Sequence, residues 1–273
     1  MKKASEIYSK MVPKLFDRSD SPEMKILCLP ELNYLTHGLP KGEMIVIGAR
    51  SSQGKSAFAV QMCSDLIKQD KKVLFLSLEM SEESIIERVV CNWLGINNMD
   101  LLKGKAFKYK EQLKDLHSSI DKWKLVVSED VGRDWNQIDK LLSELTDQPD
   151  VIILDYIQNI KSNGISKDSL DDYLINFRKL CMQRNFCGLV LSQVNRASQD
   201  GKNKSPQLHH LKSTGNLEEA ADKVFLLHYP YKTEKEKGIN YFEIHVAKNR
   251  NGMTGLVRCK YQPQFYRFSH YEG

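Results

Sequence analysis

Short apolar runs of strand length recur along the chain and restrict the folds open to it. Five of them are nearly continuous rather than alternating, at residues 44–49, 73–79, 125–129, 151–157 and 188–194. Continuous runs are typical of parallel strands, because helices cover both faces of a parallel sheet. Segments of helical character separate or follow them, at 56–69, 81–93, 108–123, 135–145 and 170–185. The alternation predicts an α/β fold, with a mainly parallel sheet and helices on both faces.

The C-terminal part has a different pattern. After a sixth apolar run at 224–229, residues 241–248 and 256–262 flank a turn-like segment that contains Asn-Gly. This arrangement predicts an antiparallel hairpin, and residues 264–268 are expected to add an edge strand. Residues 196–216 show no clear periodicity and are expected to form a loop. Near the N-terminus, residues 7–16 predict a short amphipathic helix.

Composition and charge narrow the class of protein. The 273 residues are 41% hydrophobic and 27% charged, which is ordinary for one large globular domain. No apolar run approaches the roughly 18 residues of a membrane-spanning helix, and the basic N-terminus lacks the apolar core of a signal peptide. Six scattered cysteines without a C-x-x-C pair suit a reducing compartment, so we expect a cytoplasmic protein. Residues 196–273 carry 13 basic and 8 acidic side chains, which accounts for the whole net charge of +5 and directs the search for an anionic partner there.

The strongest local motif is MIVIGARSSQGKSAFAVQM, an apolar strand, a loop of small residues and then a helix. Backbone N–H groups of such a loop and of the helix N-terminus bind phosphate, a Lys reaches the terminal phosphates, and a Ser hydroxyl binds Mg²⁺. Ala49 stands where the P-loop pattern has its first Gly. The motif predicts a nucleotide site formed by Arg50, Ser51, Ser52, Gln53, Gly54, Lys55 and Ser56.

Three polar side chains at strand ends are candidates for the same site. Asp155 ends a buried run and is expected to support Mg²⁺, with helix capping as the simpler alternative. Glu79 could activate the water that attacks the γ-phosphate, or it could compensate the dipole of the following helix. Gln193 could contact the γ-phosphate or pair with neighbouring backbone. The residues alone leave the alternatives for Glu79 and Gln193 open.

Five motifs in a fixed order carry a family resemblance: ARSSQGKS, LSLEMS, VIILDYIQ, LSQVNR and KNRNGMTG. Together they resemble the RecA-like C-terminal motor domain of the DnaB-type replicative helicases, from about residue 25 to 268. The resemblance implies a P-loop NTPase core at 25–273, preceded by an extension at 1–24 that could serve as a short interface helix. It also implies ATP and Mg²⁺ as cofactors and a homohexameric ring with ATP at the subunit interfaces.

The resemblance assigns further roles residue by residue. It makes Glu79 the catalytic base and Gln193 the relay from the γ-phosphate to the DNA loops. It makes Lys248 and Arg250 a pair that acts on the neighbouring subunit, in which the Arg reaches the neighbour's γ-phosphate. Without the resemblance, two cations near a hairpin tip would more often be solvent-facing charges.

The same resemblance implies single-stranded DNA as a partner. Lys212, Ser213, Thr214 and Gly215 match positions of the family that follow the DNA backbone in the central channel. The family often has Arg where this chain has Lys212, so the contact of Lys212 with a phosphate would lack the bidentate geometry of an arginine. Family members also carry an N-terminal helical domain that binds primase and loader. The sequence is therefore expected to be a naturally minimal form, as from a phage or mobile element, or part of a longer protein.

Three functional hypotheses follow. The first is an ATP-driven, ring-forming helicase that translocates on single-stranded DNA and unwinds duplex. The second is a RecA-like ATPase that acts as an accessory, loader or inhibitor in replication without processive unwinding. A recombinase-type filament former is disfavoured, because the motifs follow the helicase branch. The presence of Glu79, Gln193 and Arg250 favours an active motor.

Overall fold

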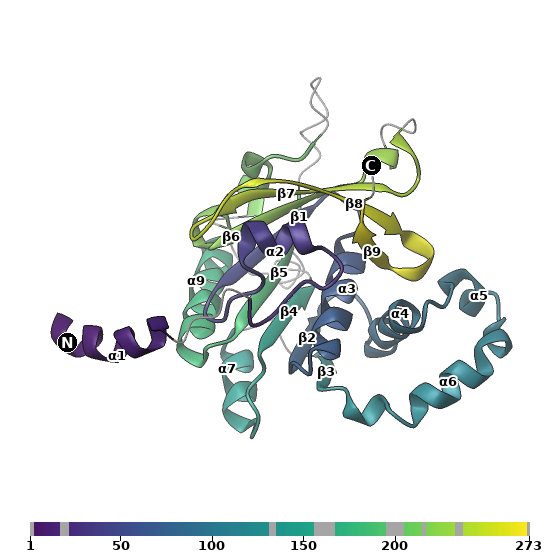
Figure 1. Cartoon of the computed structure of the whole chain (residues 1–273), viewed down its shortest axis with the longest axis horizontal. Helices are drawn as coiled ribbons and strands as arrows, with labels where there is room; N and C mark the ends of the chain where they lie inside the picture. Colours follow the sequence, from purple (N-terminus) through teal and green to yellow (C-terminus); the bar gives the residue numbers. More distant parts are fainter. Residues whose placement is uncertain are drawn as a thin grey trace.

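The structure is a computed structural model, and it describes residues 3–16, 22–130, 135–155, 167–194, 205–214, 217–232 and 237–271. Within these residues nine strands form one sheet (Figure 1). The strands are β1 (Met44–Ala49), β2 (Val73–Ser77), β3 (Leu125–Ser128), β4 (Val151–Asp155), β5 (Cys187–Gln193), β6 (Lys223–His228), β7 (Tyr241–Asn249), β8 (Gly255–Gln262) and β9 (Arg267–His270). Their order across the sheet is β3-β2-β4-β5-β1-β6-β7-β8-β9.

The first six strands of that order are parallel, and β7, β8 and β9 continue the sheet in antiparallel fashion. This confirms the predicted α/β fold with a C-terminal hairpin. Five of the six parallel strands are buried along their whole length or all but one residue. The expectation of cover on both faces is wrong for β3, where Val126 is 52% exposed. The reason is that β3 forms the edge of the sheet, so fewer neighbours cover it.

Helices cover both faces of the sheet, as predicted. One face packs against α2 (Pro30–Thr36), α3 (Lys55–Lys68) and α4 (Glu82–Leu94), and the other packs against α7 (Trp135–Glu144), α9 (Lys167–Arg184) and α10 (Leu217–Ala220). On α4, Ser81 is the N-cap and its hydroxyl accepts a hydrogen bond from the Ser84 N–H at 3.3 Å. Among the described residues, no helix is both long enough and apolar enough to cross a membrane.

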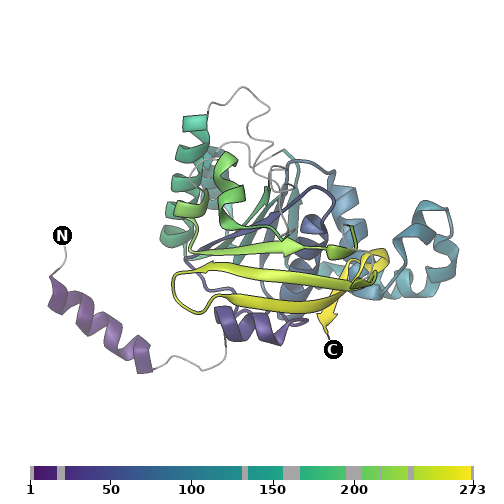
Figure 2. The same cartoon turned by 90° about the horizontal axis from the view of Figure 1, so that it is seen from above.

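The antiparallel strands close over α3, and this brings the end of the chain next to the P-loop helix. Phe58 of α3 meets Phe268 of β9 edge to face, with ring centroids 5.3 Å apart. Phe268 in turn stacks on Tyr261 of β8 at 4.4 Å. Figure 2 shows the long β7–β8 hairpin in yellow tones. Aromatic packing of this kind fixes where the C-terminal residues lie relative to the nucleotide loop.

Two helical parts stand away from the body. Helix α1 (Ala4–Phe16) is separate in both views, and α5 (Asn98–Leu102) and α6 (Lys110–His117) project from the opposite side (Figures 1 and 2). The single helix expected at 108–123 is instead α6 between two short 3₁₀ turns, η1 (Ala106–Tyr109) and η2 (Ile120–Lys122). Most residues of this arm are exposed, so little packing holds a longer helix together.

Candidate functional site

The nucleotide loop links β1 to α3. Strand β1 ends at Ala49, and Gly54 is the N-cap of α3 with φ of +82°. This left-handed conformation is strained for any residue with a Cβ, and a Cβ at Gly54 would also lie 3.2 Å from the Phe242 ring. Ser52 has a φ of +59° as well. Two positive-φ residues turn the loop sharply, so that the N-terminus of α3 faces the cleft beside the loop.

That cleft has a volume of about 610 Å³ and draws its walls from distant parts of the chain. Its sequence-predicted lining residues are Arg50, Ser51, Ser52, Gly54, Lys55, Ser56, Glu79 and Gln193. Gln53 is not among them. Its side chain is buried behind the loop, where Oε1 accepts a hydrogen bond of 2.5 Å from the Tyr229 backbone N–H. Gln53 therefore ties the loop to the end of β6.

Three charged groups interact beside the cleft: Lys55 and Glu79 line it, and the buried Asp155 lies close to Lys55 but is not a lining residue. Burial lowers the pKa of Lys55, while the negative charges of Asp155 and Glu79 oppose that shift. Burial also raises the pKa of the Asp155 carboxyl, against the charge of Lys55 and the nearby Ser56 hydroxyl. Glu79 lies two residues beyond β2, in the cleft wall and exposed to solvent. The parallel sheet thus collects one ammonium and two carboxylates from three separate strand ends.

The environment of Asp155 fits a divalent cation. Asp155 is fully buried, and within the described residues neither carboxylate oxygen has a hydrogen-bond partner of normal geometry, although the Ser56 hydroxyl lies near it. A buried carboxylate is costly when its charge is only partly offset, and here burial outweighs the Ser56 hydroxyl and the charge of Lys55. Mg²⁺ prefers oxygen ligands and keeps several of its waters, so a hydrated ion beside the Ser56 hydroxyl would satisfy both oxygens. Ser56 and Asp155 are the residues that would hold it.

Five further lining residues were not predicted from the sequence: Ala57, Met80, Arg88, Tyr261 and Tyr266. Arg88 lies on α4, with its guanidinium carbon 5.3 Å from the centroid of the Tyr266 ring. Its charge also lowers the pKa of the Asp155 carboxyl, although burial outweighs that effect. No local motif marks Arg88, Tyr261 and Tyr266, because they reach the cleft only through the docking of α4 and the closure of β8 and β9 over α3. Ala57 and Met80 instead adjoin the predicted residues Ser56 and Glu79 in the sequence.

Lys248 and Arg250 lie at the opposite ends of the parallel strands, where β1 and β6 begin. Lys248 pairs with Val224 at the beginning of β6, and Arg250 follows β7. Strand β1 runs from this end, at Met44, to the nucleotide loop, a distance of about 17 Å at roughly 3.3 Å per residue. The structure therefore does not bring this pair to the cleft of its own chain.

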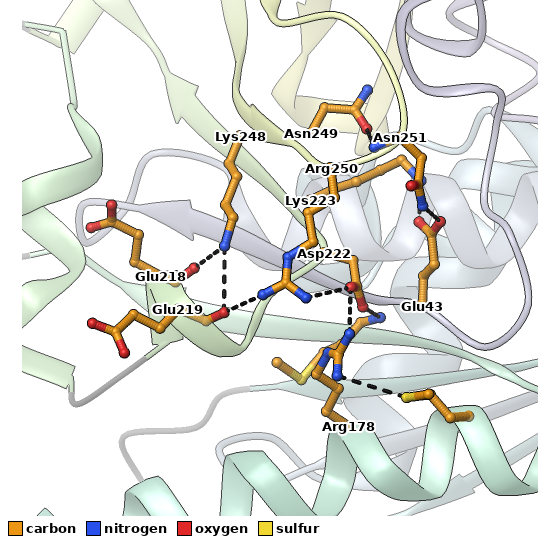
Figure 3. Close-up of polar contacts among 12 residues, drawn as sticks. Glu43, Arg178, Glu218, Glu219, Asp222, Lys223, Lys248, Asn249, Arg250 and Asn251 are labelled. Atoms are coloured by element: carbon orange, nitrogen blue, oxygen red, sulfur yellow. Dashed lines mark hydrogen bonds and ion pairs between the residues drawn. The ribbon is translucent and has the colours of Figure 1, made fainter.

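Both side chains contact the segment around α10 (Figure 3). Lys248 Nζ donates a hydrogen bond of 2.5 Å to the Glu218 carbonyl. Arg250 Nη2 donates to the Glu219 carbonyl at 2.6 Å, and Arg250 Nη1 lies 3.2 Å from Asp222 Oδ1. Burial and the charge of Arg250 lower the pKa of Lys248. These two cations are thus held by acceptors of their own chain rather than extended into solvent.

The segment expected to contact DNA is described only in part. Lys212, Ser213 and Thr214 end a 3₁₀ helix, η4 (Leu208–Thr214), within a region expected to be loop, and Gly215 lies outside the described residues. Helix η4 lies beside the end of β5 and in contact with α10. Burial and the charges of His209 and Arg50 lower the pKa of His210. Thus η4 lies within electrostatic reach of the nucleotide loop.

Comparisons with known proteins agree with this arrangement. The model of the DnaB-like helicase C-terminal domain matches residues 28–270. A probable plasmid replicative DNA helicase of Chlamydia trachomatis is 34% identical over 245 residues, covering 85% of this chain and 51% of that protein. The replicative DNA helicase DnaC of Bacillus subtilis is 27% identical, covering 89% of this chain and 55% of its own length. The chain therefore spans about half the length of these relatives.

Solved structures support the same fold. A DnaB-like replicative helicase, described together with its interactions with primase, superposes with a TM-score of 0.87 at 22% identity, over 99% of this chain and 69% of that one. A separately solved ATPase domain superposes with a TM-score of 0.86 at 22% identity over 100% of both chains. With the family match over nearly its whole length, this chain belongs to the DnaB-like helicase C-terminal domain family.

Proposed function

We propose that this chain is the motor of an ATP-dependent, ring-forming replicative DNA helicase, working in the cytoplasm of a bacterium or of a phage-infected cell. The observation that carries the proposal is that the proposed catalytic groups lie at opposite ends of the parallel strands. The nucleotide cleft lies at the carboxyl ends of these strands, and Lys248 and Arg250 lie at their amino-terminal ends. A chain divided in this way needs a neighbour to complete each site.

Within one chain, the proposed roles follow from position. Lys55 and the loop N–H groups would bind the phosphates of ATP. Ser56 with Asp155 would hold Mg²⁺, which would neutralise charge on the phosphates. Glu79 would accept the proton of the attacking water, and its position in the cleft wall supports this role. Gln193, at the end of β5 and in the cleft wall, would sense the γ-phosphate.

Between chains, Lys248 and Arg250 are proposed to act on the neighbour's ATP. A planar guanidinium that arrives from another subunit stabilises the charge of the transition state and ties hydrolysis to the subunit interface. Helix α1 is proposed to support the ring by docking on a neighbour. Its exposed apolar side chains are Ile7, Tyr8, Met11, Leu15 and Phe16. A primase or a helicase loader is a further proposed partner, since one solved neighbour is described together with primase.

The mass of the assembly tests this function. We expect a hexamer when the chain is incubated with an ATP analogue and single-stranded DNA, measured by native mass spectrometry or light scattering. Ile7→Glu in α1 should weaken that assembly, whereas Glu6→Gln on the same helix should not. A chain that stays monomeric under these conditions contradicts the ring and supports an accessory ATPase without processive unwinding.

Residues 212–215 are proposed to contact the DNA backbone, and Lys212→Ala tests this. Removing one phosphate contact should weaken binding to all single-stranded sequences alike and reduce the slope of log Kobs against log salt by about 0.7. Fluorescence anisotropy with labelled oligonucleotides over a salt series measures the slope. Lys110→Ala, an exposed lysine of α6, is the matched control and should leave the slope unchanged. An unaltered slope for Lys212→Ala would remove this residue from the DNA site.

A further inference from the structure

Asp222 is the point to which Arg250 is tied, and its own position is tightly constrained. Its side chain is only 7% exposed. Oδ1 accepts hydrogen bonds from Arg178 of α9 at 2.8 Å and from Arg250 at 3.2 Å, while Oδ2 accepts one from the Met44 N–H at 3.0 Å (Figure 3 shows the arginine contacts). The Asp222 backbone N–H and carbonyl are also bonded, to Met44 and to the Arg250 N–H. Asp222 thus connects β1, α9 and the end of β7.

The ion pair with Arg250 contributes little to folding. Arg250 is 41% exposed, and an ion pair with a solvent-exposed partner contributes little net stability. Arg178 is the better-shielded partner, at 29% exposure and a shorter distance. Asp222 therefore stabilises the fold mainly through its hydrogen bonds with Arg178 and the Met44 N–H. The main effect of its contact with Arg250 is on the position of the Arg250 guanidinium.

The second contact of Arg250 comes from α10. Arg250 and Lys248 donate to the backbone carbonyls of Glu219 and Glu218, two residues of a helix that begins at Leu217. The proposed DNA segment, 212–215, lies immediately before that helix. A backbone carbonyl cannot move independently of its helix, so a shift of α10 changes the acceptors of both cations together. A guanidinium has five N–H donors, so these contacts do not exhaust it.

We propose that Asp222 is a positioning residue for the trans-acting reaction: it sets Arg250 from within its own subunit, while α10 links that setting to the DNA segment. This inference rests on the proposed function. Presenting a guanidinium in a defined position reduces the ordering cost of reaching a phosphate in the transition state, and a displacement of about 1 Å can cost roughly 100-fold in rate. The simpler alternative is that Asp222 only joins β1 to α9.

Asp222→Asn separates the two possibilities. The amide can still accept from Met44 N–H, but it loses the charge that holds Arg250. We expect the kcat of DNA-stimulated ATP hydrolysis to fall about 10- to 100-fold, with KM for ATP changed less than about 3-fold, because Arg250 acts in the transition state. Arg178→Gln is the matched control. It should lower the melting temperature at least as much, yet leave kcat within about 3-fold of wild type. An unchanged kcat for Asp222→Asn, or an equal loss for Arg178→Gln, overturns the proposal.

A double-variant comparison shows through which residue Asp222 acts. If it acts through Arg250, Asp222→Asn should cause no further loss of kcat in an Arg250→Ala background, whereas independent effects would multiply. Multiplied losses overturn the proposal. Arg250→Ala alone is the benchmark: if it keeps wild-type kcat, the proposed function fails first and the positioning role falls with it.

Folding need not limit this experiment. Asp222→Asn leaves the partly buried Arg178 guanidinium without its carboxylate, and the loss of that ion pair is expected to lower the stability of the fold. The pair Asp222→Asn with Arg178→Met removes both charges, and Arg178→Met alone is its control. Low kcat in the pair beside near wild-type kcat in the control supports the positioning role, and a kcat near wild type in the pair overturns it. Circular dichroism melts establish folding for each variant.

Discussion

Rings in which half of the subunits carry Arg250→Ala should hydrolyse far less than half of the ATP that wild-type rings hydrolyse. Arg250 lies at the end of the parallel strands that is remote from the cleft of its own chain. Each replacement is therefore expected to disable the site of the next subunit. If the sites of a hexamer fire in a coupled sequence, only about 2% of randomly mixed rings would contain no variant subunit. In rings of pure variant, kcat should fall about 10³-fold or more, the effect typical of an arginine supplied in trans.

The measurement is steady-state hydrolysis with single-stranded DNA, as a function of the variant fraction at constant total protein. Arg258→Ala on β8 removes the same charge from the same hairpin. Its addition should leave the hydrolysis rate of mixed rings close to that of wild-type rings. Folding should be little affected by Arg250→Ala, because Asp222 keeps its hydrogen bonds to Arg178 and to the Met44 N–H. Activity that declines in direct proportion to the variant fraction would contradict a role in a neighbouring site.

The core of the fold was predictable because it depends on local patterns. A strand buried on both faces is apolar along most of its length, so β1, β2, β4 and β5 could be predicted from apolar runs. Strand β3 shows the limit of this reasoning. Its residues form an equally apolar run, but its exposure depends on its place at the sheet edge, which only the strand order decides. The 3₁₀ helix η4 and the divided arm at 106–122 have too little periodicity to be foreseen.

The candidate site was predictable to the extent that it lies at strand ends. The carboxyl ends of parallel strands meet along one side of the sheet, so the P-loop, Asp155, Glu79 and Gln193 could be grouped from the sequence. Arg88, Tyr261 and Tyr266 could not be grouped with them, because α4 docking and the closure of β8 and β9 over α3 are long-range events. The burial of the Gln53 side chain behind the loop follows from its contact with Tyr229, 176 positions further along the chain.

Asp222 illustrates a different limit. In the sequence it precedes a strand and has no motif that suggests a function. Its significance comes from three partners, Met44, Arg178 and Arg250, which lie on β1, on α9 and just beyond β7. A hydrogen-bonding hub of this kind becomes visible only when strands distant in sequence are paired. Residues that position others are therefore harder to predict than residues that line a cleft.

Glu79→Gln should nearly abolish DNA-stimulated ATP hydrolysis while leaving nucleotide binding intact. The amide keeps the size of the side chain but cannot accept the proton of the attacking water, and general bases typically contribute about 10²- to 10⁴-fold to rate. Because Glu79 is exposed and lies in the cleft wall, its replacement should leave the packing of the fold unchanged. The Kd of a fluorescent ATP analogue should therefore stay within a few-fold of wild type, while kcat collapses.

The alternative for Glu79, compensation of the α4 dipole, predicts a different result. Glu82 and Glu83 already lie in the first turn of α4, and a charge at a helix N-terminus contributes only about 0.3–1 kcal/mol. On that reading Glu79→Gln and Glu83→Gln would cause similar small falls in melting temperature and no loss of turnover. A base in the cleft requires the two variants to diverge, with kcat lost only in Glu79→Gln. Unchanged turnover in Glu79→Gln would exclude this carboxylate as the base and would favour compensation of the α4 dipole as its role.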